Sequence, residues 1–386
     1  MRNSRLVRKC LGELEEVDKL LTIIISQRWQ IGDYYMETFR THGSNAINNA
    51  TINTAPMTSE TSHSNEKEKN FMISTIRDYT INGTTIMGID HGYGNIKTTR
   101  TIFPSSAIKS NSEPAYSNDF LEYDGSYYLL GEERKSFVAE KVSDEENYIL
   151  TIAAIAKELQ ARNMTYAKLH LAVGLPLTWV KSQKEEFERY LLANEHLIFR
   201  YKGKRYEVDI VGCTVMPQCY SAVAESLSNF KGTNLLVDIG NGTMNVLYLF
   251  NGKVKEKRMW TEKLGVFQCT QKIMTAVSDK LQKQLMPEVV EEFIRTGTTD
   301  IAEKYLAVME EAARKYVDEV FQKLKDVEYD EDLMHLYFMG GGAGIVERYG
   351  EYDKNRVHFD KNLKANARGY EYFCYMKLRN AKYGRA

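Results

Sequence analysis

Several features that define common protein classes are missing from this sequence. Its 386 residues include only six prolines, which excludes a long Pro-rich stalk. The five cysteines are scattered and lack metal-ligand spacing; they are Cys10, Cys213, Cys219, Cys269 and Cys374. This cysteine usage predicts a reduced, cytoplasmic chain. The apolar stretch at residues 20–25 is interrupted by Thr22 and is far too short to span a bilayer, so we expect no membrane contact.

An excess of charge of one sign is also missing. The chain has 51 Lys and Arg residues against 52 Asp and Glu residues, which gives a formal net charge of -1. This balance gives no support for direct nucleic-acid binding, so an action on DNA would require an adaptor protein. Hydrophobic residues make up 43% of the chain, enough for a sizeable core, and the length predicts two or three domains.

The first part of the chain differs in composition from the rest. Residues 41–70 are rich in Asn, Ser, Thr, Glu and Lys and have little to bury, which predicts a disordered linker. Residues 6–39 could hold one or two helices. Two alternatives explain this extension, residues 1–70. It is either an appended helical module or an artefact of an upstream start codon. Met72 lies where a compact domain could begin.

From Thr84 onward the pattern alternates between strands and helices. Short apolar, β-rich segments predict strands at residues 84–90, 169–173, 206–215, 234–240, 245–250, 253–259 and 335–339. Apolar residues at helical spacing predict helices at residues 145–161, 183–192, 218–227 and 367–378, with a largely helical stretch at 265–324. Asp124-Gly125 and Asn251-Gly252 are typical of tight hairpin turns.

The first motif that indicates chemistry follows an apolar strand and reads Asp90-His91-Gly92-Tyr93-Gly94-Asn95-Ile96-Lys97. The strand delivers a carboxylate, two glycines let backbone N–H groups approach an anion, and Lys97 supplies a positive charge. This combination suits a triphosphate with its metal, with Asp90 facing Mg²⁺. Taken alone, it also fits an ordinary hairpin turn with surface charges.

A second motif repeats this design and reads Asp238-Ile239-Gly240-Asn241-Gly242-Thr243-Met244-Asn245. Here Thr243 adds a hydroxyl donor, although an Asn-Gly pair is also common in simple turns. Two Asp-bearing glycine turns after buried strands indicate a duplicated domain, with the turns facing each other across a cleft.

A third motif ends a buried strand in a run of glycines and reads Phe338-Met339-Gly340-Gly341-Gly342-Ala343-Gly344. The glycines would let a flat base or a ribose lie against the backbone. A simple strand-to-helix turn is the alternative.

The order of these motifs resembles the actin, heat-shock chaperone and sugar-kinase superfamily, and within it the ParM/StbA-type plasmid-segregation actins. The resemblance runs from about Ile86 to the C-terminus. The three motifs resemble the first phosphate loop, the second phosphate loop and the adenosine motif. Three further segments match a strand end and the two connecting segments; they are Gly174-Leu175-Pro176-Leu177, Val215-Met216-Pro217-Gln218 with the helix that follows, and Ala367-Arg368-Gly369-Tyr370.

This resemblance implies an α/β fold with two actin-like (ribonuclease H-like) domains that flank a nucleotide cleft. The first domain would comprise residues 71–230, completed by 345–386, and the second residues 231–344. The implied ligands are ATP and Mg²⁺, with Asp90 and Asp238 at the metal. The implied nucleotide-binding residues are Gly92, Tyr93, Gly94, Asn95, Lys97, Gly240, Asn241, Gly242, Thr243, Gly340, Gly341, Gly342 and Ala343. Glu292 and Arg295 are further candidates.

Two positions depart from the family pattern. ParM-type proteins usually carry Glu where this chain has Gln218, the residue that would position the attacking water. Gln cannot act as a general base but can orient water, so slow hydrolysis is expected. The second loop often ends in Asp, where this chain has Asn245, which makes Asp238 the main metal anchor. The implied catalytic residues are therefore Gln218, Asp238 and Asp90.

The resemblance further implies a filament-forming ATPase that segregates a plasmid or another mobile element. Its expected partners are further copies of itself, in a homopolymer, and a DNA-binding adaptor. A small-molecule kinase of the same superfamily is an alternative, although Gln218 offers it no base. The other alternative is a structural or regulatory protein that binds ATP without significant hydrolysis.

Overall fold

The computed structural model describes residues 77–114, 119–131 and 145–383. All of them belong to one unit that runs from Lys69 to Ala386. The predictions for residues 1–70, including the linker and the helices, and the start at Met72 lie outside the described residues.

Ten strands of the described chain form a first sheet, in the order β4-β3-β2-β8-β10-β9-β6-β7-β5, with β1 paired to β2. Their bounds are β1 (Thr80–Ile81), β2 (Thr84–His91), β3 (Asn95–Thr98), β4 (Ile102–Pro104), β5 (Ala107–Ser110), β6 (Phe120–Tyr123), β7 (Ser126–Leu130), β8 (Tyr166–Leu175), β9 (His196–Tyr201) and β10 (Lys204–Pro217). β2, β8 and β10 run parallel, and β2 and β3 form an antiparallel hairpin. The hairpin therefore lies beside the parallel centre of the sheet.

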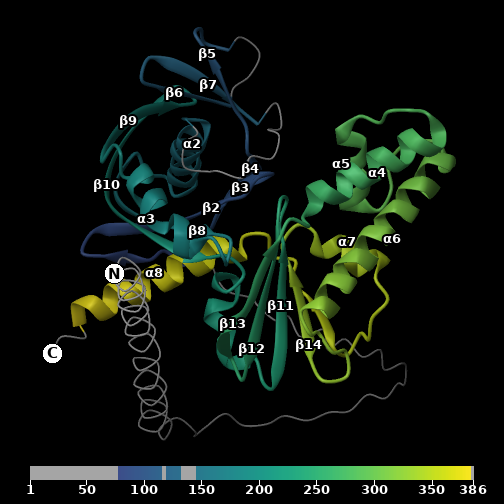
Figure 1. Cartoon of the computed structure of the whole chain (residues 1–386). Helices are drawn as coiled ribbons and strands as arrows, with labels where there is room; N and C mark the ends of the chain where they lie inside the picture. The colour runs from purple at the N-terminus through teal and green to yellow at the C-terminus, as the bar shows by residue number, and fades with distance from the viewer. Residues whose placement is uncertain (1–76, 115–118, 132–144, 384–386) are drawn as a thin grey trace, which may run out of the picture. The chain divides into compact units, whose positions relative to one another are not determined.

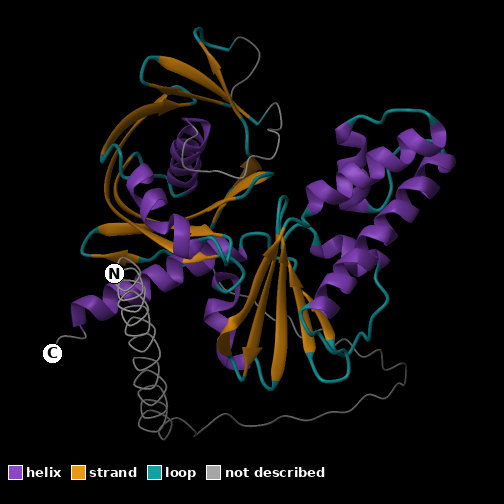
Figure 2. Ribbon diagram, viewed as in Figure 1, coloured by secondary structure: helices purple, strands orange, loops and turns teal. Residues whose placement is uncertain are grey.

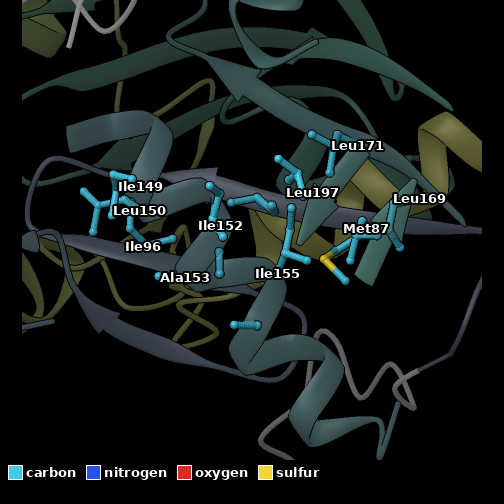
Figure 3. Packing of buried hydrophobic residues seen from close by; sticks show 14 of the residues in the cluster. Met87, Ile96, Ile149, Leu150, Ile152, Ala153, Ile155, Leu169, Leu171 and Leu197 are labelled. Carbon is cyan, nitrogen blue, oxygen red and sulfur yellow. The ribbon is translucent and has the colours of Figure 1, made fainter. Parts of the chain in front are cut away.

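The first sheet curves around α2 (Glu145–Ala161), which lies on its concave side (Figure 1). Nearly every residue of the run from Ile149 to Ala156 is buried, because α2 meets strands on several sides (Figure 3). Alternate residues of β2 face opposite layers: Met87 packs with α2, whereas Ile86 packs with α8 (Ala365–Tyr383). α3 (Val180–Leu191) joins the α2 side through Phe187.

Five strands of the described chain form a second sheet, in the order β13-β12-β11-β14-β15. Their bounds are β11 (Thr233–Ile239), β12 (Met244–Phe250), β13 (Lys253–Glu262), β14 (His335–Met339) and β15 (Val357–Phe359). Four helices cover one face (Figure 2); they are α4 (Val266–Leu281), α5 (Pro287–Thr296), α6 (Glu303–Asp326) and α7 (Ala343–Tyr349). The 3-10 helix η1 (Ser221–Asn229) packs on the other face through Leu227.

The helix α8 packs tightly because two glycines leave room for backbone. A Cβ atom added at Gly88 of β2 would lie 2.0 Å from the carbonyl oxygen of Ala367. A Cβ atom added at Gly369 would lie 1.7 Å from the carbonyl oxygen of Ser221 in η1. The start of α8, including Ala367 and Gly369, is therefore packed tightly against both β2 and η1.

The fold class predicted from the sequence is confirmed: the chain forms two sheets in succession, and each packs against helices. The predicted helix at residues 145–161 has these bounds, and both predicted hairpin turns place Asn or Asp and then Gly at positive φ. One segment differs from its expected place. Residues 345–386 were assigned to the first domain, but β15 pairs with β14 in the second sheet, and only α8 lies on the first.

The start of one helix differs from its expected place, and one strand was missed. Residues 218–227 were expected to begin a helix at Gln218, but the helix begins at Ser221 and is of the 3-10 type. The chain first turns through Cys219, whose φ of 67° breaks a helical path. The strand β9 (His196–Tyr201) was not predicted, although Leu197, Ile198, Phe199 and Tyr201 make four of its six residues apolar or aromatic.

No helix in the described part of the chain is long and apolar enough to span a membrane. The four cysteines that the structure describes, Cys213, Cys219, Cys269 and Cys374, are free thiols.

Candidate functional site

A cavity of about 330 Å³ is lined by residues from both sheets, from α5 and from the start of α8. The structure brings most of the predicted site residues to its wall; these are Asp90, Gly92, Tyr93, Gly94, Asn95, Lys97, Gln218, Asp238, Gly240, Asn241, Gly242, Thr243, Gly340 and Gly341. Gly342 and Ala343 do not line the cavity. Gly342 instead precedes α7 and donates its N–H to the Ile239 carbonyl at 2.9 Å.

The first turn connects β2 and β3 and has its own ion pair. Asp90 and Lys97 are cross-strand partners, and Lys97 Nζ lies 3.0 Å from Asp90 Oδ2. Gln218 Nε2 donates a hydrogen bond to the other oxygen, Oδ1, also at 3.0 Å. Burial opposes the charge of Lys97, but attraction by Asp90 outweighs it and raises the pKa of Lys97. The lysine therefore stays charged beside the cavity.

The second turn connects β11 and β12 and is held by a helix. The first turn of α4 donates to it, Val266 N–H to the Gly240 carbonyl at 3.0 Å and Phe267 N–H to the Asn241 carbonyl at 2.8 Å. Gly265 permits this contact, since a Cβ atom there would lie 2.3 Å from the carbonyl oxygen of Asn241. The backbone carbonyl of Thr243 closes the turn by accepting the N–H of Gly240 at 2.9 Å.

The two turns face each other closely. A Cβ atom added at Gly94 of the first turn would lie 2.9 Å from the Asn241 side chain of the second. The expectation that the glycine turns meet across a cleft agrees with this contact. Glycine at position 94 lets them approach to this distance.

Asp238 lies between the second turn and the glycine run. Burial raises its pKa, a hydrogen bond from Asn366 lowers it, and the nearby charge of Asp90 raises it again. A buried carboxylate of this kind is stabilised by a cation. Oxygen ligands from Asp90 and Asp238 fit a hard divalent ion such as Mg²⁺.

The glycine run is shaped by Asp238. Gly340 has a φ of 82°, and a Cβ atom there would lie 2.4 Å from Asp238 Oδ1. Glycine is therefore required both by backbone conformation and by space. Gly341 is open toward the cavity, since a Cβ atom there would meet nothing within 4 Å.

Asn245, where the family often has Asp, joins the two sheets. Its Oδ1 accepts the N–H of Leu177, at the end of the Gly174–Leu177 segment, at 3.1 Å. The same atom accepts the hydroxyl of Thr261 at 2.9 Å. The segment 174–177 thus contacts the second turn directly.

One wall of the cavity is a charged face of α5. Glu288, Glu291, Glu292 and Arg295 line it, at the spacing of one helix face. Both further candidates from the sequence, Glu292 and Arg295, are therefore at the cavity. Within the described ranges, no group of three or more His, Cys, Asp or Glu side chains is arranged to hold a metal ion.

Two residues of α8 were not predicted. Asn366 Nδ2 donates to Asp238 Oδ2 at 2.8 Å, and Glu371 Oε1 accepts the N–H of Gly88 at 2.9 Å, two residues before Asp90. The available signal was position, because Asn366 directly precedes the Ala367-Arg368-Gly369-Tyr370 segment.

Two family profiles match successive parts of the chain. The profile described as "Actin like proteins N terminal domain" matches residues 88–220, and that described as "Archaeal actin homologue MreB-like, C-terminal" matches residues 236–349. Together they cover more than half of the chain. A comparison with curated protein sequences finds no match.

Solved structures share the fold at low sequence identity. An archaeal actin homolog, Ta0583, matches with a TM-score of 0.59 and 19% identity over 75% of this chain and 99% of its own. The apo psk41 ParM protein matches with a TM-score of 0.58 and 16% identity over 78% and 99%. The Alp12 filament structure matches with a TM-score of 0.55 and 19% identity over 76% and 98%. The solved structures thus show the shared fold, and the two profile matches show that the chain belongs to the actin-like proteins.

Proposed function

We propose that this chain is an actin-like ATPase that binds ATP with Mg²⁺ in the cavity and polymerises into filaments that segregate a plasmid or another mobile element. The observation that carries the proposal is the close approach of two Asp-bearing glycine turns, from different sheets, at Gly94 and Asn241. Structures of relatives include Ta0583 in complex with ADP and Bacillus thuringiensis ParM with ATP, and Alp12 forms a filament.

In this proposal each side of the cavity has a separate task. Lys97 and the N–H groups of both turns bind the phosphates, while Asp90 and Asp238 hold Mg²⁺. The bound ion would neutralise negative charge on the phosphate oxygens. The glycine run from Gly340 to Gly342, with Ala343, provides the adenosine side.

Gln218 is proposed to orient the attacking water. Its side-chain amide is already within hydrogen-bonding distance of Asp90. Because an amide cannot accept a proton as a general base, hydrolysis would be slow. Slow hydrolysis suits a polymer whose lifetime depends on the nucleotide it holds.

Assembly follows from the use of two different patches on each copy. Head-to-tail contacts between identical subunits propagate into an open helix unless they close into a ring. If the patches belong to different domains, only one interdomain angle aligns them, and the nucleotide bridging both turns selects that angle. We propose residues 71–230 with α8 as one domain and the second sheet with its helices as the other. A cytoplasmic location and an adaptor for DNA complete the proposal.

The test is polymerisation of the purified protein with and without ATP and Mg²⁺, followed by light scattering and negative-stain microscopy. We expect filaments with ATP that shorten as phosphate is released. Gln218→Ala should slow phosphate release but leave assembly intact, so its filaments last longer. Scattering that stays flat over a wide protein concentration range, with ATP bound, would exclude filaments and favour the ligand-only alternative. Phosphate transfer to a member of a sugar panel would instead favour the kinase.

A further inference from the structure

The side chain of Asn366 connects Asp238 of the second turn to the backbone of Cys219, which follows Gln218. Its Nδ2 donates to Asp238 Oδ2 at 2.8 Å, and its Oδ1 accepts the N–H of Cys219 at 3.0 Å. A carboxylate only accepts and a peptide N–H only donates, so the two partners determine the orientation of the amide. A carboxamide supplies both functions at once, which a carboxylate at this position would not.

The partner of Asn366 on the other side is the residue that follows Gln218. Cys219 is fully buried and has a φ of 67°, a left-handed conformation that non-glycine residues seldom adopt. This conformation turns the chain sharply after Gln218, whose N–H bonds the Leu175 carbonyl at 2.8 Å and whose side chain reaches Asp90. The bond from Asn366 thus supports the backbone turn that aims Gln218.

A continuous chain of hydrogen bonds results. It runs from Asp238 through Asn366 to the Cys219 backbone, then along the chain to Gln218 and on to Asp90. Asn366 itself is fixed, because it lies at the start of α8, beside the glycine contacts that bind this helix to β2 and η1. A displacement of either turn is therefore transmitted to the other through this side chain.

We propose that Asn366 is a positioning residue that aligns Gln218 with Asp238, so that the groups of the two sheets adopt one arrangement around the nucleotide. This inference rests on the proposed ATPase function and extends it to a residue outside the phosphate turns. Its action is indirect, since it works through the Asp238 carboxylate and the Cys219 peptide.

The test compares the full-length protein with Asn366→Ala and with the control Asn355→Ala. Asn355 lies in an exposed turn and bonds to Asp353. Loss of a residue that orients a metal-binding carboxylate typically costs about 10- to 100-fold in metal affinity or activity. We expect Asn366→Ala to lower the hydrolysis rate by this factor. The ratio of ATP affinity in Mg²⁺ to ATP affinity in EDTA should fall by the same factor. ATP affinity in EDTA alone should change less than about threefold.

Two further readouts separate positioning from a general structural role. Hydrogen exchange in the nucleotide-free protein should show faster exchange at the Cys219 amide in Asn366→Ala. In a Gln218→Ala background, the effect of Asn366→Ala on hydrolysis should shrink, because residues that act through one another are not additive. If Asn366→Ala does not fold, Asn366→Ser serves, since one short hydroxyl cannot span both partners.

The outcomes are distinct. Wild-type protein that neither binds nor hydrolyses ATP overturns the proposed function. Wild-type protein that hydrolyses ATP, beside a folded Asn366 variant with unchanged hydrolysis, Mg²⁺ ratio and Cys219 exchange, overturns the positioning role alone. Losses that are fully additive with Gln218→Ala also overturn it.

Discussion

The two glycine turns, at residues 90–97 and 238–245, follow the same pattern of a buried strand, an Asp and a glycine turn, but they are stabilised differently. In the first, the carboxylate of Asp90 pairs with Lys97 from the same hairpin. In the second, the turn contains no basic residue, and Asp238 is bonded to the amide of Asn366 from α8. The second turn takes its support from the N-terminus of α4 instead.

This difference gives the two copies of the motif different electrostatic stability in the absence of a ligand. The first turn carries its own countercharge, so it is electrostatically stable before a ligand arrives. Burial raises the pKa of Asp238, so its ionised form is costly until a cation approaches. The second turn is therefore the half of the cavity where a bound cation would relieve more electrostatic cost.

The largest effect should come from removing the carboxylate that most needs the cation. Asp238→Ala should lower hydrolysis by about 1000-fold, the upper range for loss of one preorganised electrostatic group. Phosphate release measures this, with Asp318→Ala as the control because Asp318 is exposed on α6. Near-normal turnover in Asp238→Ala would remove this residue from the site.

The next effect concerns stability without nucleotide. Lys97→Met should lower the free energy of unfolding by about 3 kcal/mol, because it leaves Asp90 buried without its partner. In the second turn, Thr243→Val keeps the backbone carbonyl that accepts the Gly240 N–H, so it should lower the free energy of unfolding by less than about 1 kcal/mol. Urea denaturation of the nucleotide-free proteins measures both. Equal losses would show that the turns are not stabilised differently.

A pH effect should appear on the strand of the first turn. Burial raises the pKa of Glu371, which bonds to Gly88, from 4.5 to about 7. Between the pKa of the unfolded state and the higher pKa of the folded state, the folded protein keeps the proton on Glu371. The stabilisation that this proton gives is therefore lost as the pH rises toward 7. Relative to wild type, Glu371→Gln should therefore gain more than about 1 kcal/mol in unfolding free energy from pH 5 to pH 8.

Denaturation at several pH values measures this gain. Glu303→Gln is the control, since Glu303 is exposed at the start of α6. A constant difference between Glu371→Gln and wild type across the pH range would refute the prediction.

The smallest effect should come from restoring the carboxylate that the family often has. Asn245→Asp keeps the acceptor for Leu177 and Thr261, so the sheets stay joined. The added negative charge near the phosphates should weaken ATP binding in EDTA by about threefold to tenfold. Excess Mg²⁺ should restore the affinity. Equal ATP affinity of variant and wild type in EDTA would place position 245 outside the field of the phosphates.

Much of the site could be predicted because its signals are local. An Asp at a strand end followed by glycines is visible in eight residues, and so are the hairpin turns at Asp124-Gly125 and Asn251-Gly252. Asn366 and Glu371 could not be predicted in the same way. Their partners, Asp238 and Gly88, lie 128 and 283 residues away, and no periodicity connects positions at such separations.

The error at residues 218–227 has a related cause. Short polar and apolar residues after Pro217 favour a helix, and Cys has no particular preference for a left-handed conformation. The turn at Cys219 arises because Asn366 accepts its N–H and Leu175 accepts that of Gln218, contacts that come only with the tertiary structure. Long-range hydrogen bonds therefore outweighed the local helix propensity of these residues.

The packing of α8 on β2 also sets an order for biosynthesis. The chain emerges from the ribosome from its N-terminus, and β2 is made about 280 residues before the helix that covers it. The second sheet can complete its pairing once β15 has emerged, but the face of β2 that carries Ile86 stays uncovered until α8 has emerged. The part of the cavity wall that Leu363, Ala365 and Asn366 form is therefore made after the rest of its lining.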